Sequence, residues 1–170
     1  AEEERKAAPE APPAGEGQRH NEEATKALVK AMEDEDWDQV DELLQKSQDF
    51  DPDARTTDWG YSMLRTAAEE GRLETCKTLL ERKANPNALD TNSMTPLMSC
   101  IQSGDNKELV KVLLESKADA TLSTEDGFTA LAWATRLDRQ ECIAVLRAAG
   151  MEGAATCFYA LASWRYIGIP

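Results

Sequence analysis

Residues 94–119, "MTPLMSCIQSGDNKELVKVLLESKAD", decide the fold. The stretch divides into two short helical segments with a break at Gly104. In the second segment, "NKELVKVLLE" (106–115), apolar residues recur at three- and four-residue spacing, as a helix with one buried face requires. The stretch therefore predicts a helix–turn–helix unit, and the turn-rich connector that leads into its first helix (83–97) predicts a projecting loop.

The same unit recurs along the chain. Leucines at equivalent positions are spaced 36, 33 and 34 residues apart, at Leu28, Leu64, Leu97 and Leu131. Each leads into a short helical stretch and then a break, at Glu35, Gly71, Gly104 or Asp138. Further amphipathic stretches follow the other breaks, "WDQVDELLQ" (37–45), "RLETCKTLLE" (72–81) and "RQECIAVLRA" (139–148). A period near 33 residues predicts stacked structural units.

Residues 94–119 and 127–150 resemble ankyrin repeats, whose unit reads G-x-T-P-L-H-x-A-A-x-x-G…L-L-x-x-G-A-x-x-N. The resemblance implies an all-α ankyrin-repeat solenoid of about four stacked helix–turn–helix repeats with projecting loops. The repeats would cover about 24–57, 58–90, 91–124 and 125–151, and the first is degenerate but keeps its helix pair.

The chain departs from the family pattern at two places in the unit. The T-P-L-H step reads "SMLR" (62–65), "TPLM" (95–98) and "TALA" (129–132), so the family's histidine is missing from all three. Lys83 and Lys117 replace the glycine that ends the second helix. If both lysines adopt the left-handed conformation, each costs about 1 kcal/mol. We therefore expect a less stable stack than an idealised array.

Two segments of different composition flank the repeat domain, which we place at 21–151. Residues 1–20 form an acidic, Ala/Pro-rich arm without Leu, Ile, Val or aromatic residues, so we expect it to be flexible. Residues 152–170 form an apolar, aromatic tail, in which a helix over about 154–164 would cap the end of the stack. The alternative is docking on another chain. The tail residues expected to dock are Phe158, Tyr159, Trp164, Tyr166, Ile167 and Ile169.

The charge and hydropathy of the chain restrict its partners. A formal net charge of −13 opposes binding to nucleic acid or to an anionic membrane surface, and favours a basic partner. No apolar run approaches the roughly 20 residues of a membrane-spanning helix. The Trp, Tyr and Arg residues of the tail would suit peripheral contact with a membrane interface.

The sequence offers little for catalysis, metals or cofactors. Its one histidine, His20, lies in the acidic arm, and no His/Cys cluster has zinc-site spacing. We therefore predict that the chain is not an enzyme and holds neither metal nor cofactor. Trp37 and Trp133 are predicted core residues. The cysteines lack a CxxC pair and predict reduced, mostly buried thiols in an intracellular compartment; they are Cys76, Cys100, Cys142 and Cys157.

The resemblance implies that partners bind at the loop tips and the first helices of the repeats. Carried onto this chain, it selects Asp58, Trp59, Tyr61, Glu69, Glu70, Asn92, Met94, Glu125, Asp126, Phe128 and Arg136. The same rule adds Glu33, Asp34, Thr91, Gln102, Ser103 and Leu137. The large apolar members would form an exposed ridge among acids, which suits a protein partner with apolar and basic surface. The alternative is that the aromatics pack along the loops.

These features predict a non-catalytic protein–protein interaction module. Our first hypothesis is an assembly subunit of a larger complex. If Ala1 is a processed terminus, that complex could belong to a plastid or mitochondrion, including its membranes. The alternative is a soluble regulatory adaptor or inhibitor that binds one basic and apolar target through its concave face. A third class is the targeting module of a longer enzyme.

Overall fold

The computed structural model describes residues 21–57 and 59–151, and it confirms the all-α array. Over these residues the helices are α1 (Glu22–Glu33), α2 (Trp37–Lys46), α3 (Met63–Glu69), α4 (Leu73–Glu81), α5 (Pro96–Ser103), α6 (Lys107–Glu115), α7 (Ala130–Arg136) and α8 (Gln140–Ala148). None of these helices is long and apolar enough to cross a membrane. Our predictions for the acidic arm, Asp58 and the C-terminal tail lie outside the described residues.

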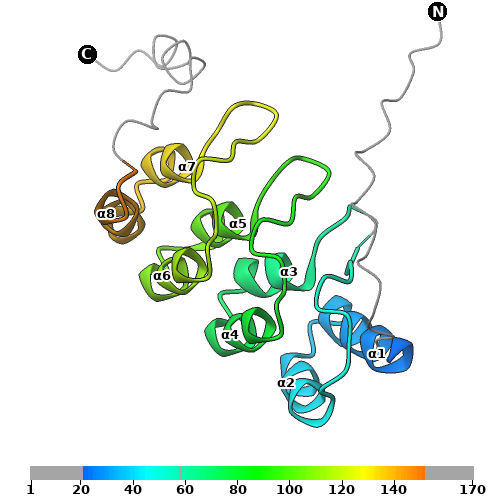
Figure 1. Ribbon diagram of the computed structural model, residues 1–170. Helices are drawn as coiled ribbons and strands as arrows, with labels where there is room; N and C mark the ends of the chain where they lie inside the picture. The colour runs from blue at the N-terminus through cyan, green and yellow to red at the C-terminus, as the bar shows by residue number, and fades with distance from the viewer. Residues whose placement is uncertain (1–20, 58, 152–170) are drawn as a thin grey trace, which may run out of the picture.

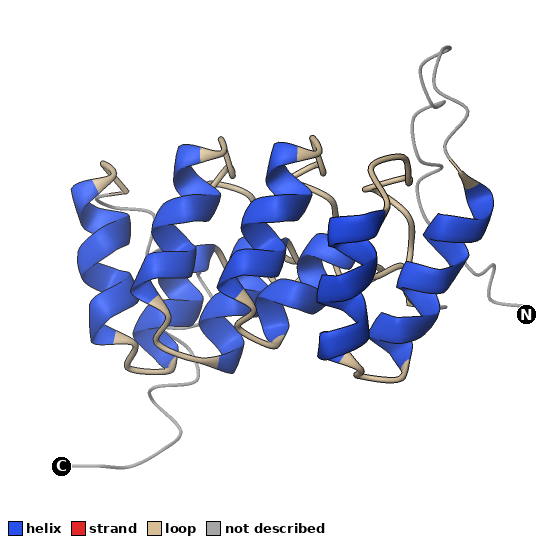
Figure 2. Cartoon of the chain, turned by 90° about the horizontal axis from the view of Figure 1, so that it is seen from below, coloured by secondary structure: helices blue, strands red, loops and turns tan. Residues whose placement is uncertain are grey.

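The helices form two layers (Figure 1). The first helix of each repeat, α1, α3, α5 or α7, lies in an inner layer, and each packs against the next. The second helices, α2, α4, α6 and α8, form the outer layer in the same order. Figure 2 shows the pairs side by side along the array. Each helix therefore buries one face against its own pair and another against the adjacent repeats.

Side chains at the N-cap position begin the inner helices. The Asn21 side chain accepts hydrogen bonds from the N–H groups of Glu23 and Ala24 at 3.0 and 3.2 Å. In the later repeats, Ser62, Thr95 and Thr129 each cap the helix that follows, accepting from the N–H three residues ahead. These caps satisfy N–H groups that have no partner within the helix. They fix where each loop ends.

Polar contacts across the repeat boundaries tie successive loops together. The carboxylate of Asp53 accepts the N–H of Asn85 at 2.7 Å, and the Asn87 side-chain oxygen accepts the N–H of Asp119 at 2.7 Å. Each bond joins residues 32 positions apart, which is close to one repeat. The outer helices are linked in the same way, because Arg82 donates to the carbonyl of Gln48 at 2.7 Å. The repeat boundaries are thus held by hydrogen bonds as well as by apolar packing.

The two lysines after α4 and α6 adopt the left-handed conformation, so the condition that we set for their cost in stability is met. Lys83 and Lys117 both have a φ of 68°. At the predicted breaks within the helix pairs, Gly71, Glu35 and Asp138 are also left-handed. Gly104 differs, because its φ of −169° is extended backbone that any residue can adopt. Around the helix ends, two lysines and two acids therefore occupy positions that favour glycine, and Ser93 in the loop before α5 is a fifth such residue among those described.

One continuous apolar core runs through the repeats. The leucines that set the register, Leu28, Leu64, Leu97 and Leu131, are all buried. Trp37 is buried as predicted, and so are the three described cysteines. Trp133 is only half-buried, and it packs against the edge of the core and against the ring of Phe128. The prediction that Trp133 is a core residue is therefore only partly correct.

Candidate protein-binding surface

The loops before α3, α5 and α7 project beyond the inner helices (Figure 1) and are internally ordered. In each loop, a backbone N–H donates to the carbonyl of a residue four or five positions later in the chain. These bonds run from Thr56 to Tyr61 at 2.8 Å, from Asp90 to Met94 at 3.2 Å, and from Thr124 to Phe128 at 3.0 Å. A residue with positive φ turns each tip, Gly60, Ser93 or Gly127. The loops and the exposed sides of the inner helices together form what we call the inner face.

Trp59 is the most exposed large apolar side chain in the described part of the chain, with 64% of its surface accessible. Its backbone is nevertheless fixed, because its carbonyl accepts the N–H of Thr91 in the next loop at 3.2 Å. Arg55 donates to the carbonyls of Gly60 and Leu89, which clamps the two neighbouring loops. The indole of Trp59 is therefore exposed, while hydrogen bonds to the neighbouring loop fix the backbone that carries it.

Leu89 is a member of the inner face that our sequence analysis missed. Its side chain is 40% exposed, and Arg55 holds its carbonyl beside the Trp59 loop. The family rule selected the residues at the loop tip and passed over the residue before Asp90. The sequence did contain a signal for its exposure, because Leu89 stands directly before a predicted turn and outside the amphipathic helices that form the core.

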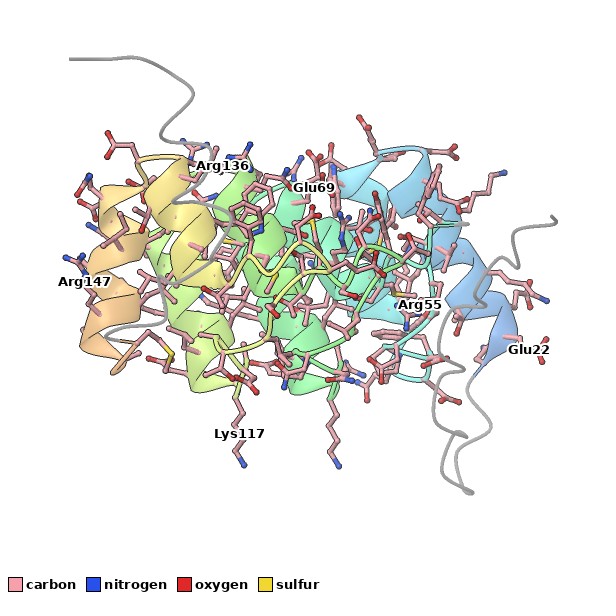
Figure 3. All side chains as sticks on the ribbon, turned by 90° about the horizontal axis from the view of Figure 1, so that it is seen from above. Glu22, Arg55, Glu69, Lys117, Arg136 and Arg147 are labelled. Atoms are coloured by element: carbon pink, nitrogen blue, oxygen red, sulfur yellow. The ribbon has the colours of Figure 1, made fainter. Side chains whose placement is uncertain are left out.

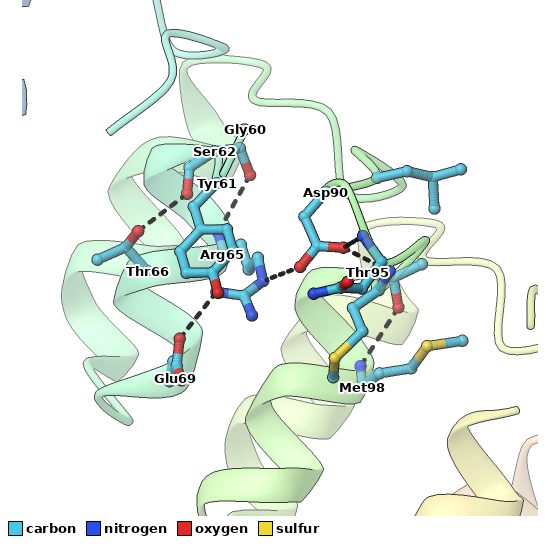
Figure 4. A network of polar contacts seen from close by, with 12 residues as sticks. Gly60, Tyr61, Ser62, Arg65, Thr66, Glu69, Asp90, Thr95 and Met98 are labelled. Atoms are coloured by element: carbon cyan, nitrogen blue, oxygen red, sulfur yellow. Dashed lines mark hydrogen bonds and ion pairs between the residues drawn. The ribbon is translucent and has the colours of Figure 1, made fainter. Parts of the chain in front are cut away.

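A polar network lies beneath the loop that carries Tyr61 (Figure 4). Arg65 is buried and its guanidinium lies 3.4 Å from the centroid of the Tyr61 ring. It donates to the Glu69 carboxylate at 2.8 Å and pairs with Asp90 at 3.1 Å. Tyr61 is half-buried on top of this cation rather than standing free. Contact between a cation and the face of an aromatic ring is favourable, so Arg65 helps to hold the Tyr61 ring in place.

Met94 corrects part of our prediction, because it does not belong to an exposed ridge. Its side chain is only 7% exposed and packs in the apolar core. The Asp90 carboxylate accepts the N–H groups of Asn92 and Met94, both at 2.8 Å, and this turn directs Met94 inward. Asn92 stays exposed at the tip. The apolar surface is therefore interrupted at the third repeat.

The last repeat carries a second aromatic group on the inner face. The ring centroids of Phe128 and Trp133 are 5.3 Å apart, and the exposed guanidinium of Arg136 lies 5.3 and 5.4 Å from them. Phe128 is half-buried. The alternative that the aromatic residues pack along the loops is therefore correct for part of the Phe128 side chain. Burial leaves the Trp133 Nε1 without a hydrogen-bond partner among the described residues.

The charged members of the predicted set remain accessible. Glu70, Glu125, Asp126 and Arg136 are exposed, and Glu69 is half-exposed beside Arg65. Asp58 lies outside the described residues. The inner face thus combines Trp59, the three partly covered aromatic residues Tyr61, Phe128 and Trp133, and several acids, but it has no continuous apolar ridge. Protein interfaces concentrate binding energy in such anchors and surround them with polar groups.

The thiols contribute nothing reactive to this surface. Burial raises the pKa of Cys76 and Cys100 to about 12, and the same effect, together with contact with Asp105, raises the pKa of Cys142 to about 12. These thiols are therefore protonated at neutral pH, and the thiolate is the reactive form. Over the ranges that the structure describes, no cluster of three or more His, Cys, Asp and Glu residues could hold a metal ion.

Comparison with known proteins agrees with this architecture. Residues 64–114 match a family model described as ankyrin repeats in many copies. Human transient receptor potential cation channel subfamily A member 1 is 39% identical over 96 residues, 56% of this chain and 8% of that protein. Human neurogenic locus notch homolog protein 4 is 37% identical over 99 residues, 58% of this chain and 5% of that protein.

A third relative covers more of the chain. Ankyrin repeat, SAM and basic leucine zipper domain-containing protein 1 of Dasypus novemcinctus is 30% identical over 135 residues, 77% of this chain and 28% of that protein. The chain therefore spans only a small part of the length of these relatives. The chain carries an ankyrin-repeat array, which is a protein–protein interaction module.

Proposed function

We propose that the chain binds a protein partner through the inner face, with Trp59 as the anchor residue of that face. The observation that carries the proposal is the combination of an exposed indole with hydrogen bonds to its own carbonyl and to the carbonyl of Gly60, the next residue. An ordered backbone loses little conformational entropy on binding, and burial of a large aromatic supplies much of the affinity of an interface. Leu89 enlarges the apolar area beside it.

The partner surface that fits is apolar at its centre and basic around it. Glu70, Glu125 and Asp126 are exposed on the inner face, and the whole chain carries a net charge of −13. Exposed charges of one sign increase the rate of encounter with a partner of opposite sign more than they increase affinity. The specific contact would then depend on Trp59 and Phe128.

Within this role we propose an assembly subunit of a larger complex rather than a freely diffusing regulator. The support comes from the sequence, because an acidic arm (1–20) and an apolar tail (152–170) flank the repeats and offer two further contact segments. We place the complex in a reducing compartment of the cell, an organelle included, because Cys76, Cys100 and Cys142 are free thiols. Contact of the tail with a membrane interface remains part of the proposal.

Quantitative affinity purification tests the proposal. The full chain, its Trp59→Ala variant and a Gln45→Ala control on the exposed side of α2 are expressed with the same tag, and the recovered proteins are compared by mass spectrometry. Trp59→Ala should lower recovery of the partner at least about tenfold, as loss of an interface anchor does. The Gln45→Ala variant should recover it in full. Equal recovery with Trp59→Ala would refute the proposal.

Deletion of 157–170 separates the two roles. An assembly subunit should lose more of its partner on this deletion than on Trp59→Ala, whereas a regulator should show the reverse order. Circular dichroism of each variant verifies that the repeats remain folded. The comparison therefore decides between the two roles even before the partner is identified.

A further inference from the structure

The last residues of the inner helices form a row with ordered charge. Glu33 ends α1, Glu69 ends α3, Ser103 ends α5 and Arg136 ends α7. The residues that follow continue the pattern, with Asp34 after α1, Glu70 after α3, Gly104 after α5 and Leu137 after α7. The first two helix ends are therefore acidic, the third is uncharged and the fourth is basic.

The row lies along one edge of the molecule. Each inner helix packs against the next, from α1 to α7, so their ends follow in sequence. Figure 3 shows Glu69 and Arg136 along the same edge, with Lys117 at the opposite edge. Glu33, Glu70 and Arg136 are exposed, and Glu69 is half-exposed. The charges are thus accessible to a partner that lies across the helix ends.

Helix stability does not account for the acids in this row. The C-terminal end of a helix carries partial negative charge, so Glu33 and Glu70 are electrostatically unfavourable there, whereas Arg136 is favourable. The unfavourable charge of Glu69 is neutralised by Arg65, whose guanidinium donates a hydrogen bond to the Glu69 carboxylate at 2.8 Å. Within the described residues, no hydrogen bond or ion pair is found for the side chains of Glu33 and Glu70. Residues that break a local rule without a structural gain are candidates for function.

We infer that this row binds an extended partner segment with ordered charge. Its basic residues would lie against the ends of α1 and α3, an uncharged stretch over α5, and its acidic residues against Arg136. This inference rests on the proposed function and specifies the charge order of the partner. Packed helix axes are about 8–10 Å apart, so α3 and α7 are separated by about 16–20 Å, the length of about five or six extended residues.

Two labelled peptides of equal composition test the charge order. One has three lysines, six uncharged residues and three glutamates; the other has the same uncharged core and alternates lysine with glutamate on both sides of it. The ordered peptide should bind the full chain about fivefold to tenfold more tightly in fluorescence anisotropy at low salt. The difference should shrink at 0.5 M salt, because exposed charges are screened. Equal affinity, or binding of neither peptide, would overturn the inference.

Charge-reversal variants locate the contact. Glu70→Lys and Arg136→Glu should each remove most of the preference for the ordered peptide. Glu81→Lys on α4 and Arg147→Glu on α8 carry the same changes at exposed outer positions and should leave it unchanged. Should Trp59→Ala abolish capture of the natural partner while Glu70→Lys and Arg136→Glu leave it intact, the proposed function would stand and the inferred charge order would be wrong.

Discussion

Arg65 and Asp90 form a buried ion pair that joins the second repeat to the loop of the third. Arg65 Nε lies 3.1 Å from Asp90 Oδ2, and the two side chains are 4% and 0% exposed. The other carboxylate oxygen of Asp90 accepts two loop N–H groups, at 2.8 Å each. One carboxylate therefore neutralises a buried cation and also fixes the conformation of a loop on the inner face.

Replacing Asp90 with alanine should destabilise the array strongly. The change leaves the Arg65 charge buried with Glu69 as its one remaining charged partner among the described residues, and it removes the acceptor of the N–H groups of Asn92 and Met94. Removing one partner of a buried ion pair typically costs about 3–5 kcal/mol. Urea denaturation followed by circular dichroism measures the loss in the free energy of unfolding.

A double variant serves as the control for this prediction. Met98 occupies the position equivalent to Arg65 in the next repeat, so Arg65→Met is a substitution that the fold already accommodates. Combined with Asp90→Asn, which keeps an acceptor for the loop, it should cost less than Asp90→Ala alone. A double variant as unstable as Asp90→Ala would show that the loss comes from the loop rather than from the unpaired charge.

How much could be predicted from the sequence differs between the helices and the inner face. The spacing of Leu64 and Leu97 predicted the helix pairs and the buried core, because a period of one repeat reflects local geometry that each unit shares. The burial of Met94 was not predictable in this way. It depends on the turn that Asp90 fixes, and Asp90 is itself held by Arg65, which is 25 positions away in the chain. Such contacts have no periodic signal.

Replacing Lys83 or Lys117 with glycine should stabilise the array. Both lysines have a φ of 68°, a conformation that glycine adopts without steric cost. Relief of this strain is partly offset by the greater freedom of glycine in the unfolded chain, so we expect a gain of about 0.5–1 kcal/mol at each position. Urea denaturation gives the free energies.

Lys111 provides the matched control for these glycine substitutions. It lies inside α6 and is exposed, so Lys111→Gly should instead cost about 1 kcal/mol because glycine is unfavourable within a helix. If Lys83→Gly or Lys117→Gly were as destabilising as Lys111→Gly, the left-handed residues would not be sites of strain.

Asp105 caps a helix of the next repeat, and its removal should weaken that boundary. Its carboxylate accepts the N–H groups of Glu141 and Cys142 at 3.2 and 2.9 Å, at the start of α8, which has no side-chain cap of its own. Asp105→Ala should therefore cost about 1 kcal/mol at neutral pH, the usual effect of losing a cap. Glu115→Ala, an exposed acid on α6, should change the free energy of unfolding little.

The effect of Asp105 should also depend on pH. Burial acts to raise its pKa, but the hydrogen bonds from Cys142 and Glu141 and the charge of Arg139 outweigh burial and lower the pKa. A carboxyl group with a lowered pKa stabilises the fold above its unfolded pKa, near 3.9, and loses this effect on acidification. The difference between the wild type and Asp105→Asn should therefore narrow as the pH falls below about 4. A difference that stays constant across this pH range would contradict the lowered pKa of Asp105.

The three buried thiols should react only when the array unfolds. Burial raises the pKa of Cys76, Cys100 and Cys142 to about 12, so the folded chain holds three protons that the unfolded chain releases above about pH 8.5. Stability should therefore fall as the pH rises from about 8.5 to 12, and less steeply in Cys76→Ala.

Alkylation resolved by mass spectrometry tests the same burial at each site. With iodoacetamide at pH 8, Cys76, Cys100 and Cys142 should stay unmodified in the folded chain over the time in which the urea-unfolded chain reacts completely. The unfolded chain, treated with the same reagent at the same pH, provides the control for reactivity. Modification of Cys76 in the folded chain at the unfolded rate would contradict its burial and would mean that the core around α4 opens without global unfolding.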